Sequence, residues 1–190
     1  MEDTYPKMRP DKPIHLPTNT GNRQPLWQAL AKQAPELAGK RVLALHAGDG
    51  WFCRYAINHG AVAVLGVDQD ARAISSARDT ASSDRLRYRI MPDHTLGLLT
   101  GPYDLIVGTF DLAHDDLHAI SESLSGLLRR NGQFLAAVTT PITAATPEQG
   151  LQLKTLFTQR LTIDALYQLS DTRLQTREQI HFVFSSRSGH

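Results

Sequence analysis

The chain has 190 residues, with 20 Lys and Arg against 19 Asp and Glu and a formal net charge of +1. This length predicts one domain, since domains run to roughly 100–200 residues, and 41% hydrophobic with 21% charged residues exclude the disordered and fibrous classes. A surface without excess positive charge attracts polyanions weakly, so the composition disfavours a nucleic-acid or membrane partner, although a local basic patch stays open.

Cysteine usage and hydropathy predict a soluble, cytoplasmic protein. Cys53 is the single cysteine, which excludes an internal disulfide and a cysteine-rich zinc site. Residues 1–13 carry charges and three prolines but no apolar run of the kind that forms the core of a secretory signal. No apolar run approaches the ~20 residues that a membrane helix needs, so we expect no membrane partner.

Residues 1–25 form a proline-rich arm in this interpretation, because they hold five prolines and few aliphatic side chains. The arm is either a disordered tail or a lid that folds over a pocket, and the sequence leaves both open. Residues 26–190 are predicted as a single domain, which starts with a helix that has Pro25 in its first turn.

Alternating helical and extended patterns follow in chain order. The extended segments are expected at residues 41–45, 61–67, 86–91, 103–107, 133–138, 162–169 and 179–185. The helices are expected at residues 51–58, 71–81, 115–130 and 147–160, with an Asn131-Gly132 turn after the third of these. The long amphipathic helix has acidic residues near its start and arginines near its end, the polarity that the helix dipole favours.

Strands that alternate with helices predict an α/β fold with a doubly wound, mostly parallel sheet and helices on both faces. The last two extended segments have no helix between them, so they should bring an antiparallel strand to one edge of the sheet. Ligands of such sheets bind beyond the carboxyl ends of the strands, and these ends therefore hold the candidate site.

Small and acidic residues follow the first two predicted strands. Gly48 and Gly50 allow a tight turn and a close approach of backbone N–H groups to a ligand. Asp68 follows the second strand, where a carboxylate can accept hydrogen bonds from ribose hydroxyls. The order and spacing of these residues predict a nucleoside-containing cofactor. A dinucleotide site would have a third glycine at position 53, where this chain has Cys53. No phosphate-loop motif is present either, which argues against hydrolysis of ATP or GTP.

The motifs resemble those of the class I S-adenosylmethionine-dependent methyltransferases over about four-fifths of the chain, from Leu37 onward. The matching segments are VLALHAGDGWFCRYAINHGA, GVDQD, MPDHTL, YDLIVGTFDLAHDD, LLRRNGQFLAAV and QIHFVFSSR. The resemblance implies a seven-stranded sheet of order 3-2-1-4-5-7-6 with the last strand antiparallel. It also implies S-adenosylmethionine as cofactor and S-adenosylhomocysteine as product. The cofactor-binding residues carried over to this chain are His46, Ala47, Gly48, Asp49, Gly50, Asp68, Gln69, Asp93, His94, Thr109 and Phe110.

Two residues depart from the family's first motif. Ala44 stands where an acidic side chain usually holds the methionine end of the cofactor, and His46 stands where a glycine is usual. Loss of one charged hydrogen bond costs about 1.5–3 kcal/mol, which corresponds to roughly one to two decades in affinity. Either His46 itself contacts the cofactor carboxylate, or the domain has lost methyl transfer and serves as a binding or partner protein.

His114 is the candidate general base, since it follows the fourth strand in a segment where relatives often carry histidines. A solvated helix start is the alternative for this residue. Asp111, His114, Asp115 and His118 have the ligand types of a metal site. Asp115 and Asp116 already have a capping role at the helix start, however, so no metal is expected. The predicted acceptor is a small molecule. A tRNA or RNA methyltransferase and an NAD-dependent oxidoreductase are the alternatives, and the oligomeric state is not predicted.

Overall fold

A computed structural model describes residues 24–111, 114, 115, 117–141, 162–168 and 179–187 of the protein. The helices are α1 (Gln24–Gln33), α2 (Trp51–Asn58), α3 (Ala71–Thr80), the 3₁₀ helix η1 (Asp93–Leu98) and α4 (Leu117–Leu127). The strands are β1 (Arg41–Leu45), β2 (Ala63–Asp68), β3 (Leu86–Ile90), β4 (Tyr103–Asp111), β5 (Leu128–Pro141), β6 (Thr162–Gln168) and β7 (Gln179–Arg187). The predicted arm and the predicted helix at residues 147–160 lie outside the described residues, apart from the arm's last two positions, which belong to α1.

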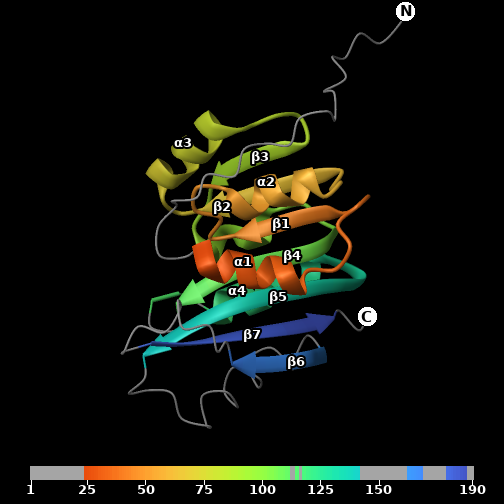
Figure 1. Cartoon of the computed structure of the whole chain (residues 1–190), viewed down its shortest axis with the longest axis vertical. Coiled ribbons are helices and arrows are strands. Elements are labelled where there is room, and N and C mark those ends of the chain that lie inside the picture. Colours follow the sequence, from red (N-terminus) through yellow and green to blue (C-terminus); the bar gives the residue numbers. More distant parts are fainter. Residues whose placement is uncertain (1–23, 112–113, 116, 142–161, 169–178, 188–190) are drawn as a thin grey trace, which may run out of the picture.

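The strands form one sheet in the order β3-β2-β1-β4-β5-β7-β6 (Figure 1). β1 to β5 pair in parallel, which confirms the predicted α/β class with a parallel sheet. β7 pairs antiparallel with both β5 and β6. β2 and β3 lie on one side of β1, and β4 and β5 lie on the other, so the strand order reverses between β1 and β4. A ligand site is expected at the carboxyl ends of these two strands.

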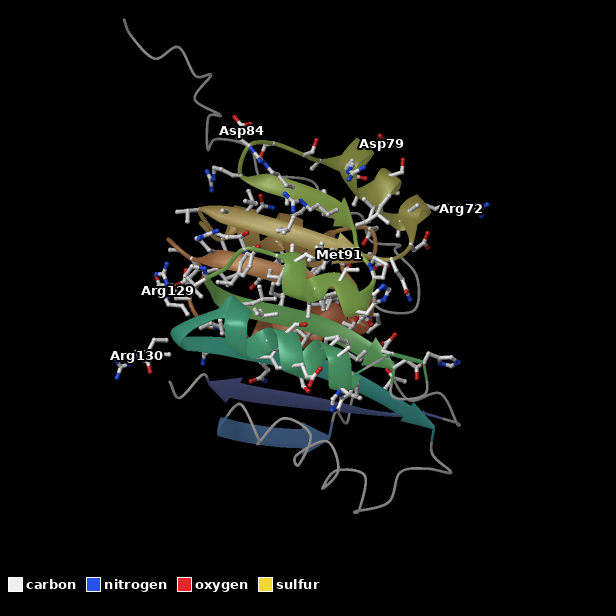
Figure 2. All side chains as sticks on the ribbon, turned by 180° about the vertical axis from the view of Figure 1, so that it is seen from behind. Arg72, Asp79, Asp84, Met91, Arg129 and Arg130 are labelled. Carbon is white, nitrogen blue, oxygen red and sulfur yellow. The ribbon has the colours of Figure 1, made fainter. Side chains whose placement is uncertain are left out.

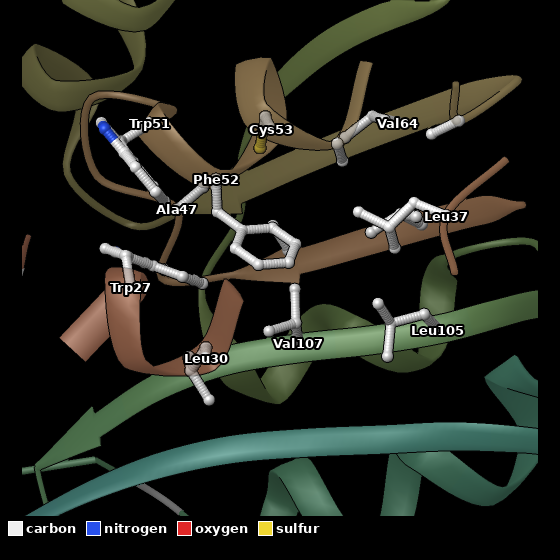
Figure 3. Close-up of a cluster of buried hydrophobic side chains, with 14 of the residues drawn as sticks. Trp27, Leu30, Leu37, Ala47, Trp51, Phe52, Cys53, Val64, Leu105 and Val107 are labelled. Atoms are coloured by element: carbon white, nitrogen blue, oxygen red, sulfur yellow. The ribbon is translucent and has the colours of Figure 1, made fainter. Parts of the chain in front are cut away.

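Alternating side chains of the buried strands supply two hydrophobic layers. In β1, Val42 and Ala44 belong to the cluster under α1, α2 and α3, whereas Leu43 and Leu45 belong to the cluster under η1 and α4. Figure 3 shows Trp27 of α1 and Phe52 of α2 directed toward the sheet within the first cluster, and their rings lie 5.5 Å apart. Both faces of β1 are therefore covered, as its unbroken aliphatic sequence predicted.

The element boundaries differ from the predicted ones mainly around β4 and β5. β4 was expected to end at residue 107, but it continues to Asp111 because residues 108–111 pair with β5 up to Thr139. The register between these strands shifts from Tyr103↔Leu128 to Leu105↔Gln133. The predicted Asn131-Gly132 turn lies within that irregularity, and Asn131 has a φ of 62°. The helix expected at residues 115–130 is the shorter α4. Within the described residues, no helix is long and apolar enough to span a membrane.

Candidate cofactor site

The loop from β1 to α2 carries two glycines in left-handed conformations, with φ of 56° at Gly48 and 79° at Gly50. The Gly50 N–H closes the turn on the Ala47 carbonyl at 3.0 Å. Only glycine adopts such angles without strain. A Cβ on Gly50 would overlap the Tyr88 ring, whereas a Cβ on Gly48 would meet no atom within 4 Å. The loop therefore presents bare backbone to open space at Gly48.

The end of β2 holds this loop in place. Asp68 Oδ2 accepts the Gly48 N–H at 2.9 Å, and Asp68 Oδ1 accepts the Asp70 N–H at 2.9 Å. The Ala47 N–H donates to the Val67 carbonyl at 3.0 Å. The structure thus brings together the two features that the sequence singled out at successive strand ends, the glycine turn and the acidic residue.

A buried arginine braces the loop from α2, and the sequence analysis did not single it out. The Arg54 side chain is fully buried, donates to the Asp49 carbonyl oxygen and forms an ion pair with Asp49 Oδ2 at 3.2 Å. Asp49 Oδ1 also accepts the Trp51 N–H at 3.3 Å. The sequence held one indication of this role, an arginine within the otherwise apolar run WFCRYAI. A charged side chain in such a run is buried only if it has a partner.

His46 lies at the centre of the site in a left-handed conformation, with a φ of 53°. This angle costs a non-glycine residue about 1–2 kcal/mol, and it explains physically why glycine suits this position. The ring is buried and meets Asp93 Oδ1 through Nε2 at 2.8 Å. Its Nδ1 lies 3.1 Å from the Thr109 carbonyl oxygen and 3.3 Å from Asp115 Oδ2. The side chain therefore joins three segments that are distant in sequence.

The surroundings of His46 favour its protonated form. Burial by itself would lower the pKa of His46, but the hydrogen bonds and negative charges of Asp115 and Asp93 outweigh it and raise the pKa to about 9. The Thr109 carbonyl can only accept, so Nδ1 carries a proton, and Nε2 faces a carboxylate. His46 is thus an imidazolium at neutral pH, held between two carboxylates.

The ligand atoms of His46, Asp93 and Asp115 lie within 4.8 Å of one another, and this is the set among the described residues that has the spacing of a metal site. The two carboxylates, however, face different nitrogens of one ring. A single ion cannot bind both nitrogens of an imidazole, so this geometry suits a doubly hydrogen-bonded imidazolium. Asp111, His114, Asp115 and His118 are not gathered around one point, since Asp115 faces His46 and His118 faces Glu122 at 3.9 Å.

The end of β4 forms the wall beside His46. Thr109 and Phe110 were expected to follow the strand, but both lie within it and are buried. The Phe110 ring meets the His46 ring edge-on, with 5.1 Å between centroids. Thr109 Oγ1 is buried with no hydrogen-bond partner within the described part of the chain. The Thr109 side chain is fully enclosed by protein atoms, so its contribution to the wall is its carbonyl oxygen beside His46.

The other predicted residues lie toward the surface. Gln69 and His94 are exposed beyond the ends of β2 and β3. The side chain of His114 is 78% exposed, and its Nδ1 lies 3.1 Å from Asp111 Oδ2. The solvated alternative for His114 therefore describes its position, and a role as general base stays a prediction.

No family model matches the sequence. The chain is 32% identical over 103 residues to the ribosomal protein L11 methyltransferase of Vibrio vulnificus, a match that covers 52% of this chain and 33% of the relative. An L11 methyltransferase of Vibrio cholerae is 29% identical over the same length. The matched part thus spans about a third of these curated relatives.

Solved structures match almost the whole chain. An S-adenosylmethionine-dependent methyltransferase of Mesorhizobium loti superposes with a TM-score of 0.67 at 20% identity, covering 88% of this chain and 98% of that one. The ribosomal protein L11 methylase of Lactobacillus delbrueckii subsp. bulgaricus gives 0.70 at 17% identity, covering 100% and 91%. The chain has the class I methyltransferase fold. Ala44, the fourth residue of β1, and His46, directly after the strand, are the two positions that depart from the motif of the resemblance.

Proposed function

We propose that the protein binds S-adenosylmethionine at the carboxyl ends of β1, β2 and β4 and transfers its methyl group to an acceptor. The observation that carries this proposal is the pairing of Gly48 with Asp68 in a methyltransferase fold, beside open space. We include in the proposal a cytoplasmic location, which the single cysteine favours.

Asp68 is the residue that would hold the ribose hydroxyls. Each of its carboxylate oxygens accepts one backbone N–H, and a carboxylate offers about four lone-pair sites, so acceptor capacity is left on both oxygens. By the family resemblance, Asp93 would face the adenine, and the bare backbone at Gly48 would lie along the cofactor. The bound cofactor supplies a methyl group on a good leaving group, so this chain has chiefly to align the acceptor and exclude water.

His46 is proposed to act through the carboxylates that it holds. Both of its ring nitrogens already have protein partners, which leaves no donor for the cofactor carboxylate without a rearrangement. Its positive charge fixes Asp93 and Asp115 at the mouth of the site. Asp115, which faces His46, is a candidate partner for the ammonium of the cofactor.

For the acceptor, we propose a small molecule, with His114 as the general base where the acceptor must lose a proton. The near-neutral net charge supports this choice. One structural neighbour is a geranyl diphosphate C-methyltransferase of Streptomyces coelicolor, with a TM-score of 0.67 at 10% identity. A protein acceptor is the second candidate, because the curated relatives are ribosomal protein L11 methyltransferases.

Calorimetry with S-adenosylhomocysteine tests the cofactor proposal before any acceptor is known. The variant Asp68→Asn keeps an oxygen for the Gly48 N–H but removes the charge, so we expect its affinity to fall about 10–100-fold. Asp79→Asn, on the exposed side of α3 (Figure 2), is the matched control and should bind like the wild type. Absence of binding by the wild type would support the alternative of a degenerate, non-catalytic domain.

A further inference from the structure

A row of arginines lies on β3, an edge strand of the sheet. Arg85 precedes the strand, and Arg87 and Arg89 alternate along it with the buried Leu86 and Tyr88. Because side chains alternate between the two faces of a strand, the three arginines share the face of η1 and α4. Figure 2 shows η1 and α4 over β1, β4 and β5 on this side, while no described helix covers β3.

The arginine row borders a cleft of about 290 Å³. Arg41, at the start of β1, lines its other side, and the guanidinium carbon of Arg41 lies 5.5 Å above the Tyr103 ring. Asp84 is the single acidic residue of the lining. Four arginines against one aspartate give the cleft a formal charge of +3 (4 − 1), although the whole chain carries only +1.

These charges are not neutralised within the described part of the chain. Its ion pairs include none that involves Arg41, Arg85, Arg87 or Arg89. The Arg85 guanidinium donates to the Ala61 carbonyl at 2.6 Å. Arg87 and Arg89 are exposed, and no hydrogen bond of their side chains is found there. Like charges gathered on one surface repel one another unless an anion lies between them.

The geometry points to a single strand of RNA as the occupant, and we propose that this cleft is an RNA-docking surface. Residues two apart on a strand are spaced by about 6.6 Å, so the guanidinium groups form a line that a phosphate backbone can follow. Guanidinium forks bind phosphate oxygens bidentately and also stack on bases.

An acidic protein strand is the competing occupant, and β3 is poorly suited to it. A strand that adds to a sheet edge needs the free backbone groups of that edge. The Tyr88 carbonyl is already taken by Arg78 Nη2 at 2.8 Å. The RNA proposal goes beyond the proposed function, because the cleft begins at the amino ends of β1 and β2, whereas Gly48 and Asp68 lie at the carboxyl ends.

Fluorescence anisotropy with a labelled single-stranded RNA of about 12 nucleotides tests the proposal on the full chain. The test variant is Arg87→Ser with Arg89→Ser, and the control is Arg72→Ser with Arg130→Ser, two exposed arginines outside the cleft (Figure 2). Between about 50 and 200 mM salt, loss of two phosphate contacts should lower the slope of log K against log salt by about 1.4. We expect at least tenfold weaker binding for the test variant and binding within threefold of the wild type for the control.

A charge-conserving variant, Arg87→Lys with Arg89→Lys, should give an intermediate affinity if the guanidinium forks contribute. All variants should bind S-adenosylhomocysteine like the wild type, which separates this proposal from the proposed function. Equal losses in test and control variants, no RNA binding at about 50 mM salt, or competition by polyglutamate as effective as by polyuridylate would each overturn the RNA assignment.

Discussion

The charge of His46 is predicted to make the stability of the protein depend on pH. The variant His46→Asn removes the titrating group but keeps a residue that tolerates the left-handed backbone of this position. The wild type and His46→Asn should therefore differ in the free energy of unfolding by an amount that changes with pH.

The magnitude follows from the raised pKa. His46 has a pKa of about 9 in the folded state against the ordinary 6.5 of a histidine, and each pKa unit corresponds to about 1.4 kcal/mol. The folded pKa lies above the unfolded one, so the stabilisation is fully present below about pH 6.5 and is lost as pH rises through about 9. The stabilisation lost is on the order of 3 kcal/mol. This exceeds the cost of the left-handed backbone at His46, which is roughly 1–2 kcal/mol.

Urea unfolding, followed by the fluorescence of the buried Trp27 and Trp51, measures this dependence. Between about pH 6 and pH 9.5 the wild type should lose on the order of 3 kcal/mol relative to His46→Asn, a shift of its midpoint by about 1 M or more. A difference that stays constant over this range would refute the imidazolium held between Asp93 and Asp115.

Three further predictions concern the loop and its supports. Gly50→Ala should destabilise the protein by about 2–4 kcal/mol, because it combines a left-handed backbone angle with overlap on the Tyr88 ring. Gly48→Ala should cost only about 1 kcal/mol, because its Cβ meets no other atom. Equal costs of the two variants in thermal unfolding would contradict this. Arg54→Met should lower the free energy of unfolding by about 2–3 kcal/mol, because it removes the charge-assisted hydrogen bonds to Asp49. Arg72→Met is the control and should leave the free energy of unfolding unchanged. An unchanged urea midpoint for Arg54→Met would disprove the bracing role. Burial raises the pKa of the Cys53 thiol to about 12. Mass spectrometry should therefore find no alkylation of Cys53 by iodoacetamide at about pH 8 until urea unfolds the protein. Rapid alkylation of the folded protein would show that the thiol is accessible.

Much of the architecture could be predicted from periodicity. The helix at residues 51–58 has the predicted bounds, and the juxtaposition of Gly48 with Asp68 follows from placing both at the ends of neighbouring parallel strands. The length of β4 could not be predicted, because Gly108 and Thr109 interrupt the aliphatic run. They continue the strand only because β5 pairs with them as far as Thr139.

The site's electrostatics required the tertiary structure. The sequence showed that His46 was unusual, but its partners Asp93 and Asp115 come from segments after β3 and β4 that no local pattern connects to it. The arginines around β3 were interpreted from the sequence as a solvated face, for a related reason. In sequence, nearby aspartates dilute the arginines, whereas in the structure Asp70 caps α3 through the Arg72 N–H, and Arg41 joins the row from β1.

The most direct test of the central claim is the affinity of the full chain for S-adenosylhomocysteine, measured by calorimetry for the wild type, Asp68→Asn and the control Asp79→Asn. The proposed site predicts saturable one-to-one binding by the wild type and the control, with a loss of about 10–100-fold in Asp68→Asn. No binding by the wild type at about 1 mM ligand, or equal affinities of all three proteins, would contradict a cofactor site built on Gly48 and Asp68.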